Sequence, residues 1–480
     1  MIVWEKATIK IRTNEIIKDL NLKISKGKTL GIIGSNGTGK TMLAKAIAGQ
    51  IQVHGREIIE KEGLKKVFVS FLSSFRMRNG FAAFRQQRWN NIDPDSVPTV
   101  KQELEYEKNK SSLDPLLEMF NFGQHIDKYV ISLSNGEQRK LELIRALSQK
   151  PDVLVLDNAF NGLDHASREL LTEMLDKMAA TEQTIILTGS KKEDFPPSVK
   201  HFILLQKQEN PREITRDKIP AEQQGIPLGI IELPRWKNSQ YQHIFEIKNV
   251  SMKYGEKEIL KDISWKVSPG EHWVLSGGNG SGKTSLLNLI FADNPKAYAC
   301  NIMLFGKQRG SGESIWNIKQ KIGFISPELQ QYLPDKQSAL QVICSGLYDS
   351  EGLFTKPTSY ELSLAKQWLT LLGDTDWAEK TYGELSTSAQ RVVLLMRTLI
   401  KNPPLLLLDE PFQGLDRSTI LRMKTLLLVV AQKTNCAMVM TTHFPEEIPD
   451  FFDHELALNN GKAIFCGPMK QSVQKFPKSI

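Results

Sequence analysis

Two glycine-rich stretches, one in each half of the chain, constrain the fold more than any other feature. The second, residues 277–284, reads Gly-Gly-Asn-Gly-Ser-Gly-Lys-Thr and fits the pattern G-x-x-x-x-G-K-[ST]. Glycines let such a loop curl so that several backbone N–H groups point at one anion. Lys283 is predicted to reach the β- and γ-phosphates of a nucleotide, and the Thr284 hydroxyl to hold Mg²⁺. A strand expected at 271–276 and a helix expected from 285 place the loop at a helix N-terminus, where anions bind.

The same pattern recurs at residues 34–41, so a phosphate-binding loop is predicted in each half of the chain. The predicted nucleotide-binding residues are Gly34, Ser35, Asn36, Gly37, Thr38, Gly39, Lys40 and Thr41 in the first half, and Gly277, Gly278, Asn279, Gly280, Ser281, Gly282, Lys283 and Thr284 in the second.

The two halves read as copies of one domain. A shift of 243 positions carries Lys40 onto Lys283, and a shift of 252 carries Asp157 onto Asp409. Repeats of this length indicate two domains rather than a solenoid of short units.

We therefore expect a first domain over residues 1–205 and a second over 244–480. The segment between them, 206–243, is polar and contains four prolines, which exclude a continuous helix and predict an extended linker.

Each copy alternates predicted strands with helices, which favours the α/β class. The apolar runs 153–156 and 405–408 are too short for helices and fit parallel strands that are buried on both faces. Residues 71–132 and 326–384 lack such short apolar runs, and we predict that they are mostly helical insertions.

Composition limits the class of protein without identifying it. The 480 residues are 40% hydrophobic and 24% charged, with a formal net charge of +8, as in an ordinary globular protein. A charge this small over this length does not favour nucleic acid as a partner. The sequence shows no apolar run of the ~18 residues that cross a bilayer and no signal-peptide pattern at its start, so we expect a cytoplasmic protein. Four cysteines without C-x-x-C spacing predict neither a zinc site nor a disulfide framework.

Further motifs follow each phosphate loop in the same order. Ser134 and Ser386 each open a turn that precedes a helix, and each lies 23 residues before the aspartate that ends an apolar strand. Gly-Leu-Asp follows that strand at 162–164 and at 414–416. This order resembles the nucleotide-binding domain of the ATP-binding-cassette family, over essentially the whole chain outside the linker.

The resemblance implies two P-loop NTPase domains, each with an antiparallel β subdomain and a helical subdomain. It also implies an intramolecular pair of cassettes, arranged head to tail, that binds and hydrolyses ATP. Each ATP would lie on one cassette's phosphate loop and be capped by the serine turn of the other, so that ATP binding closes the pair and hydrolysis releases it. The capping residues would be Ser134 and Gly136 for the second loop and Ser386 for the first. The implied Mg²⁺ ligands are Thr41 and Asp157 in the first cassette and Thr284 and Asp409 in the second.

The second copy carries every catalytic residue that the resemblance implies. Glu410 would orient the attacking water, His443 matches the histidine that senses the γ-phosphate, and Lys283 completes the catalytic set. Tyr254 lies 29 residues before Lys283, where an aromatic ring stacks on adenine.

The first copy departs from the family pattern. Asn158 replaces the glutamate, and a carboxamide cannot accept a proton from water. Thr188-Gly189-Ser190 contains no histidine, and Ile11 stands at the adenine-stacking position. In the serine turn that would cap the first loop, Ser388 stands where the pattern has glycine. All these losses fall on one composite site, so we expect one hydrolytic site and one that binds nucleotide with little turnover.

Within the family, residues 345–352 and 409–416 resemble the tandem soluble ATPases associated with molybdate uptake, also known as photorepair-type proteins. That resemblance implies a role in transport with a separate membrane permease, at the inner face of the cell membrane. The alternative is a tandem cassette ATPase associated with ribosomes or nucleic acid, but those proteins normally join their domains by a long, charged, helical arm. The family also expects a glutamine after the strand near 322–325, where this chain has Glu328 followed by Gln330 and Gln331.

Overall fold

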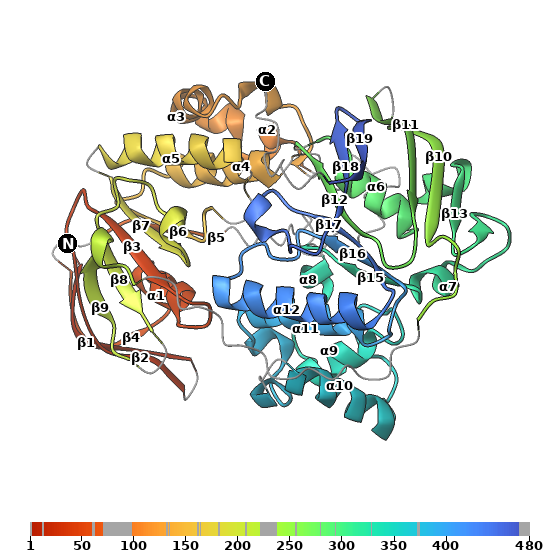
Figure 1. Ribbon diagram of the computed structural model, residues 1–480. Coiled ribbons are helices and arrows are strands. Elements are labelled where there is room, and N and C mark those ends of the chain that lie inside the picture. The colour runs from red at the N-terminus through yellow and green to blue at the C-terminus, as the bar shows by residue number, and fades with distance from the viewer. Residues whose placement is uncertain are drawn as a thin grey trace. The chain divides into compact units, whose positions relative to one another are not determined.

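The computed structural model describes residues 2–11, 14–59, 63–70, 98–130, 133, 135–160, 163, 165–180, 183–206, 209–220, 238–254, 257–278, 280–292, 294–327, 329–371 and 375–469. The chain divides into two compact units, Met1–Glu222 and Gln223–Ile480 (Figure 1).

The first unit is built around a six-stranded sheet in the order β5-β6-β7-β3-β8-β9, parallel except for its last pair. Its strands are β3 (Thr29–Gly34), β5 (Lys66–Ser70), β6 (Val153–Asp157), β7 (Thr184–Gly189), β8 (His201–Leu205) and β9 (Arg212–Thr215). Because β3, β6 and β7 are parallel neighbours, their carboxyl ends meet at one edge of the sheet.

A second, antiparallel sheet of the first unit has the order β2-β1-β4 and consists of β1 (Ile2–Ile11), β2 (Asn14–Ile24) and β4 (Val53–Ile59). The helices are α1 (Lys40–Ile47), α2 (Val100–Glu103), α3 (Tyr106–Met119), α4 (Asn135–Ser148) and α5 (His165–Ala179). Helix α1 and the antiparallel sheet share one hydrophobic cluster with the central sheet, and α3, α4 and α5 share another.

The second unit repeats this plan. Its six-stranded sheet has the order β15-β16-β17-β12-β18-β19 and its antiparallel sheet the order β11-β10-β13-β14. The strands are β10 (Phe245–Tyr254), β11 (Lys257–Val267), β12 (His272–Gly277), β13 (Ile302–Leu304), β14 (Lys307–Gln308), β15 (Ile322–Ile325), β16 (Leu405–Asp409), β17 (Ala437–Thr441), β18 (His454–Asn459) and β19 (Lys462–Pro468). The helices are α6 (Lys283–Ile290), α7 (Ile315–Lys319), α8 (Leu329–Tyr332), α9 (Ala339–Ser345), α10 (Ser359–Leu371), α11 (Thr387–Leu399) and α12 (Arg417–Lys433).

Strand β16 shows why a run of four leucines forms a strand here. Successive side chains of a strand point to opposite faces. Leu406 and Leu408 join the cluster that contains α11 and α12, whereas Leu405 and Leu407 join the cluster that contains α6 and the antiparallel sheet. Both faces are covered, so an unbroken apolar run is stable in this strand. The predicted α/β class, with an antiparallel β subdomain and a helical subdomain in each copy, is confirmed.

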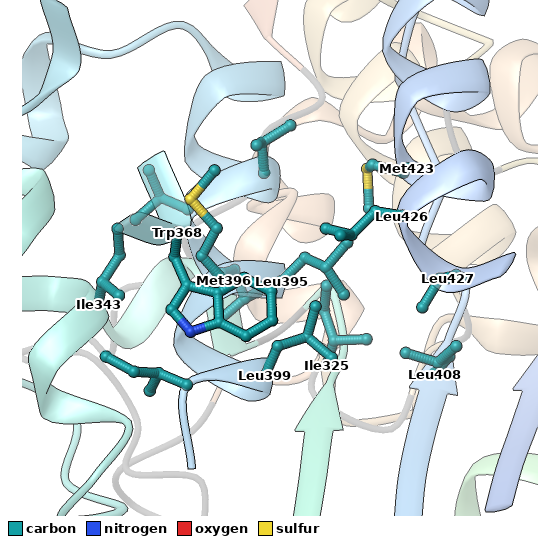
Figure 2. Packing of buried hydrophobic residues seen from close by; sticks show 14 of the residues in the cluster. Ile325, Ile343, Trp368, Leu395, Met396, Leu399, Leu408, Met423, Leu426 and Leu427 are labelled. Carbon is teal, nitrogen blue, oxygen red and sulfur yellow. The ribbon is translucent and has the colours of Figure 1, made fainter. Parts of the chain in front are cut away.

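The helical subdomain of the second unit packs around Trp368 of α10, whose side chain is 0% exposed. Figure 2 shows its indole ring among Ile343 of α9 and Leu395, Met396 and Leu399 of α11. This packing fixes helix α11, whose first turn belongs to the serine turn that Ser386 opens. Within the described part of the chain, no helix is both long enough and apolar enough to cross a bilayer.

The segment predicted as a linker, 206–243, contributes structure to both units where it is described. Strand β9 (Arg212–Thr215) adds to the first sheet by pairing with β8. At the other end, the backbone N–H of Ser239 donates to Asn435 Oδ1, and Tyr241 packs against the second unit's core. Residues 221–237 of the predicted linker lie outside the described residues.

Candidate active sites

Both phosphate loops connect a strand of the central sheet to a helix. Gly34 ends β3 and Lys40 begins α1, while Gly277 ends β12 and Lys283 begins α6. Gly282, directly before α6, has φ 104°, a left-handed conformation that favours glycine. The helix N-terminus therefore begins at the lysine that is expected to contact phosphate.

The first glycine of the second loop passes very close to the neighbouring strand. A Cβ atom at Gly277 would lie 2.3 Å from the backbone oxygen of Leu458 on β18. In contrast, a Cβ atom at Gly278, the next residue, would meet nothing within 4 Å. The loop thus needs glycine at 277 for the packing of its own backbone.

The two loop lysines have the same environment. Lys40 Nζ donates to the backbone oxygens of Gly34 (2.8 Å) and Ser35 (2.9 Å). Lys283 Nζ donates to those of Gly277 (2.8 Å) and Gly278 (3.0 Å). Each ammonium is buried within the curl of its loop, where it can reach phosphate oxygens.

Ser281 adds a polar group that fits a phosphate ligand. Its side chain is buried, and its hydroxyl has no hydrogen-bond partner among the residues that the structure describes. A buried hydroxyl costs free energy unless a partner satisfies it. A triphosphate, which offers many acceptor oxygens, would supply that partner, so the second loop fits ATP.

In the first unit, the aspartate at the end of β6 joins the phosphate loop to β7. Thr41 Oγ1 donates to Asp157 at 3.1 Å and 2.9 Å from its two carboxylate oxygens, and Thr188 Oγ1 donates to Oδ1 at 2.6 Å. Burial raises the pKa of Asp157, while the hydrogen bonds from Thr188 and Thr41 and the charge of Lys40 act in the opposite direction.

The second unit repeats this chain of contacts. Thr284 Oγ1 lies 3.4 Å from Asp409 Oδ2, and Thr441 Oγ1 donates to Oδ1 at 2.6 Å. A hydroxyl and a carboxylate side by side are hard oxygen ligands of the kind that Mg²⁺ takes. Mg²⁺ commonly binds through one or two carboxylates plus substrate phosphates, which is consistent with the described residues holding no cluster of three or more metal-binding side chains.

Glu410, the residue after β16, is held at both its backbone and its side chain. Its φ is 46°, which is uncommon for a residue other than glycine, and its N–H donates to Thr441 Oγ1 at 3.1 Å. Its Oε1 lies 3.0 Å from His443 Nε2, and its Oε2 accepts a 2.6 Å hydrogen bond from Gln413 Nε2. The structure thus brings Glu410 and His443 into direct contact.

Asn158 occupies the corresponding place in the first unit. Its φ is 53°, and its N–H donates to Thr188 Oγ1 at 2.9 Å. Thr188 and Thr441 make equivalent contacts, and Ser190 and His443 each lie two residues after these threonines. Ser190 therefore stands at the position of His443. Its hydroxyl donates to Asn36 Oδ1 of the phosphate loop at 3.1 Å. The first unit therefore has an amide and a hydroxyl where the second has a carboxylate and an imidazole.

The serine turns are described only in part. Ser386 is the N-cap of α11, and its hydroxyl accepts from the backbone N–H of Ala389 at 3.3 Å. Gly136 lies in the first turn of α4. Ser134 and Asn279 lie outside the described residues, and so does the side chain of Tyr254, the last residue of β10.

Sequence reasoning missed several residues that organise the second site. Thr441 and Gln413 contact the two acids directly, although a threonine at a strand end has no distinctive sequence signal. Gln330, in contrast, is one of the glutamines that the sequence offers after the strand near 322–325. It lies in α8 and donates to the backbone oxygen of Thr387 at 3.2 Å, so it joins the segment after β15 to the serine turn that Ser386 opens. Arg391 of α11 donates to the backbone oxygen of Ser326 at 3.0 Å.

Arg391 is also electrostatically linked to the site. Burial lowers the pKa of Arg391 to about 10, and the negative charges of Glu410 and Asp409 oppose that shift. Helix α11 therefore carries a buried positive charge that interacts with the two acids at the end of β16.

Comparison with known proteins identifies the family. The ABC transporter family model matches residues 17–161 and 260–413, more than half of the chain. The chain is also 30% identical over 474 residues, 94% of its length and 95% of the relative's, to the ABC transporter ATP-binding protein ModF of Escherichia coli. The chain belongs to the ABC transporter family.

It is an ATP-binding-cassette ATPase with two cassettes in tandem. An uncharacterised ABC transporter ATP-binding protein of Schizosaccharomyces pombe shares this length, with 28% identity over 94% of this chain and 96% of that protein. Among solved structures, cbiO1 of Clostridium perfringens, part of the ABC transporter complex cbiONQ, aligns with a TM-score of 0.42 and 22% identity, covering 47% of this chain and 89% of that one.

The close approach of Gly277 to β18 predicts a difference between two adjacent substitutions. Gly277→Ala forces a Cβ atom against the Leu458 carbonyl at a left-handed φ, so we expect it to destabilise the second unit by about 2 kcal/mol. Gly278→Ala meets open space and should cost less than about 0.5 kcal/mol. Thermal unfolding of the two variants measures the difference, and equal stability would contradict the steric role of Gly277.

Proposed function

We propose that only the second of the two ATP sites hydrolyses ATP rapidly, while the first binds nucleotide with little turnover. The observation that carries this proposal is the contrast at one backbone position. Glu410 presents a carboxylate beside His443, whereas Asn158, in the same left-handed conformation, has Ser190 at the position of the histidine.

The catalytic roles follow from the chemistry of each group. The Glu410 carboxylate can accept a proton from water, whereas the Asn158 amide can only hydrogen-bond to it. Lys283, buried in its loop, would stabilise negative charge on the β- and γ-phosphates. Thr284 and Asp409 would hold Mg²⁺, which neutralises charge on the phosphates when it is bound.

We further propose that each ATP is completed by the other cassette, as the family resemblance implies. Ser134 and Gly136 would cap the second loop, and Ser386 would cap the first. Tyr254 would stack on adenine in the second cassette. In this proposal 1–205 and 244–480 are the cassettes, 206–243 connects them, and ATP draws the two together within one chain.

We propose that the cellular task of this protein is to drive transport. ATP-dependent closure of its two cassettes would act on a separate membrane permease, at the inner face of the cell membrane. The similarity to ModF, an ABC transporter ATP-binding protein matched over 95% of its length, supports a transport role. The match between residues 409–416 and the tandem ATPases of molybdate uptake favours molybdate-type transport.

The asymmetry of the sites predicts unequal effects of the two loop lysines. Lys283→Ala should reduce steady-state ATPase activity by at least about 100-fold, because it removes a phosphate-stabilising charge from the hydrolytic site. Lys40→Ala should leave at least about a tenth of the activity, because its own site has no glutamate. Phosphate release from the purified variants measures both rates. Equal loss of activity in the two variants would contradict the asymmetry.

A hydrolysis-deficient variant should identify the partner. Glu410→Gln keeps the shape of the side chain but cannot accept a proton, so ATP should remain bound and keep the cassettes closed. With ATP, this variant is expected to co-sediment with membranes that contain its permease, and the wild type should do so more weakly. Co-sedimentation with ribosomes instead would exclude the transport role.

A further inference from the structure

Gln413 makes a contact with Glu410 that the roles proposed above do not explain. Its side-chain Nε2 donates a 2.6 Å hydrogen bond to Glu410 Oε2, and its backbone N–H donates to the Glu410 backbone oxygen at 3.2 Å. Two hydrogen bonds therefore join Gln413 to Glu410, the residue that is expected to direct the attacking water.

The turn that carries Gln413 is itself well fixed. Phe412, the preceding residue, is buried in the core of the second unit, and its backbone oxygen accepts from the Leu415 N–H at 3.2 Å. Asp416 then caps helix α12 through the Thr419 N–H at 2.9 Å. Gln413 thus projects from a packed turn, so its amide can impose an orientation on a neighbouring side chain.

Glu410 needs such a constraint. Its long side chain can adopt several rotamers, and only some of them aim the carboxylate at a water molecule. One carboxylate oxygen faces the His443 imidazole and the other faces the Gln413 amide. Because the two contacts use different carboxylate oxygens, the hydrogen bond from Gln413 does not depend on the contact with His443.

We infer that Gln413 is a positioning residue for ATP hydrolysis, which orients the Glu410 carboxylate toward the attacking water without contacting nucleotide. A primary amide suits this role because its N–H bonds the carboxylate without taking its charge, so the carboxylate remains a proton acceptor. The inference rests on the proposed role of Glu410 as the residue that directs water.

Two substitutions test the role of the amide. Gln413→Leu removes the donor, and Gln413→Glu replaces it with an acceptor of the same shape. Both should lower kcat by about tenfold or more, as expected for loss of a hydrogen bond to a charged group, and both should leave the KM for ATP within about twofold of the wild type. Gln308→Glu, which adds the same charge at an exposed position of β14, is the matched control and should keep the wild-type kcat.

A double-mutant cycle separates positioning from general damage to the fold. In a Glu410→Gln background, Gln413→Leu should cause no further loss of the residual single-turnover rate, because the carboxylate that it positions is gone. A further tenfold loss there, or a kcat within twofold of the wild type in both Gln413 variants, would overturn the inference. If Glu410→Gln itself kept the wild-type rate, the proposed function would fail as well, so the two failures are distinguishable.

Discussion

A carboxylate at the end of a buried strand holds each candidate site together. Asp157 and Asp409 each accept one threonine hydroxyl from the helix after the phosphate loop and another from the end of the adjacent parallel strand. The arrangement depends on strand register, because Asp409 is paired directly with Thr441 across the sheet. Because Asp409 ends β16, this pairing also sets the position of the next residue, Glu410.

The two units keep this frame but differ in chemistry. The residue after each aspartate has a left-handed backbone and donates its N–H to the following strand's threonine. Asparagine tolerates that conformation better than glutamate does. The first unit therefore has at this position a less strained residue whose side chain cannot accept a proton. Glu410 instead combines an unfavourable backbone conformation with a carboxylate that can, and such strain is common at functional sites.

Much of the fold and of the sites could be predicted from sequence, because the signals are local. The phosphate loops, the leucine strand 405–408 and the repeat itself depend on residues close together in the chain. Side-chain contacts that depend on three-dimensional structure could not be predicted. The hydrogen bond from Thr441 to Asp409 depends on the register of two strands, and the hydrogen bond from Gln413 to Glu410 depends on the shape of a turn. The segment Thr188-Gly189-Ser190 could be aligned with Thr441-Thr442-His443 from the sequence, and the equivalent hydrogen bonds of Thr188 and Thr441 follow the same alignment. Strand β9 lies in a segment predicted as a linker, where its pairing with β8 has no local signal.

The proposed difference in ATP hydrolysis between the two sites is tested most directly by following ATP that is already bound. The purified chain would be loaded with ATP labelled on its γ-phosphate, separated from free nucleotide and quenched in acid at successive times after Mg²⁺ is added. A single rapid phase should convert about half of the bound ATP, which is the half bound at the second site, and the half bound at the first site should persist long after that phase is complete. Conversion of all bound ATP in one phase at a single rate would show that both sites hydrolyse equally and would contradict the assignment of catalysis to Glu410 alone.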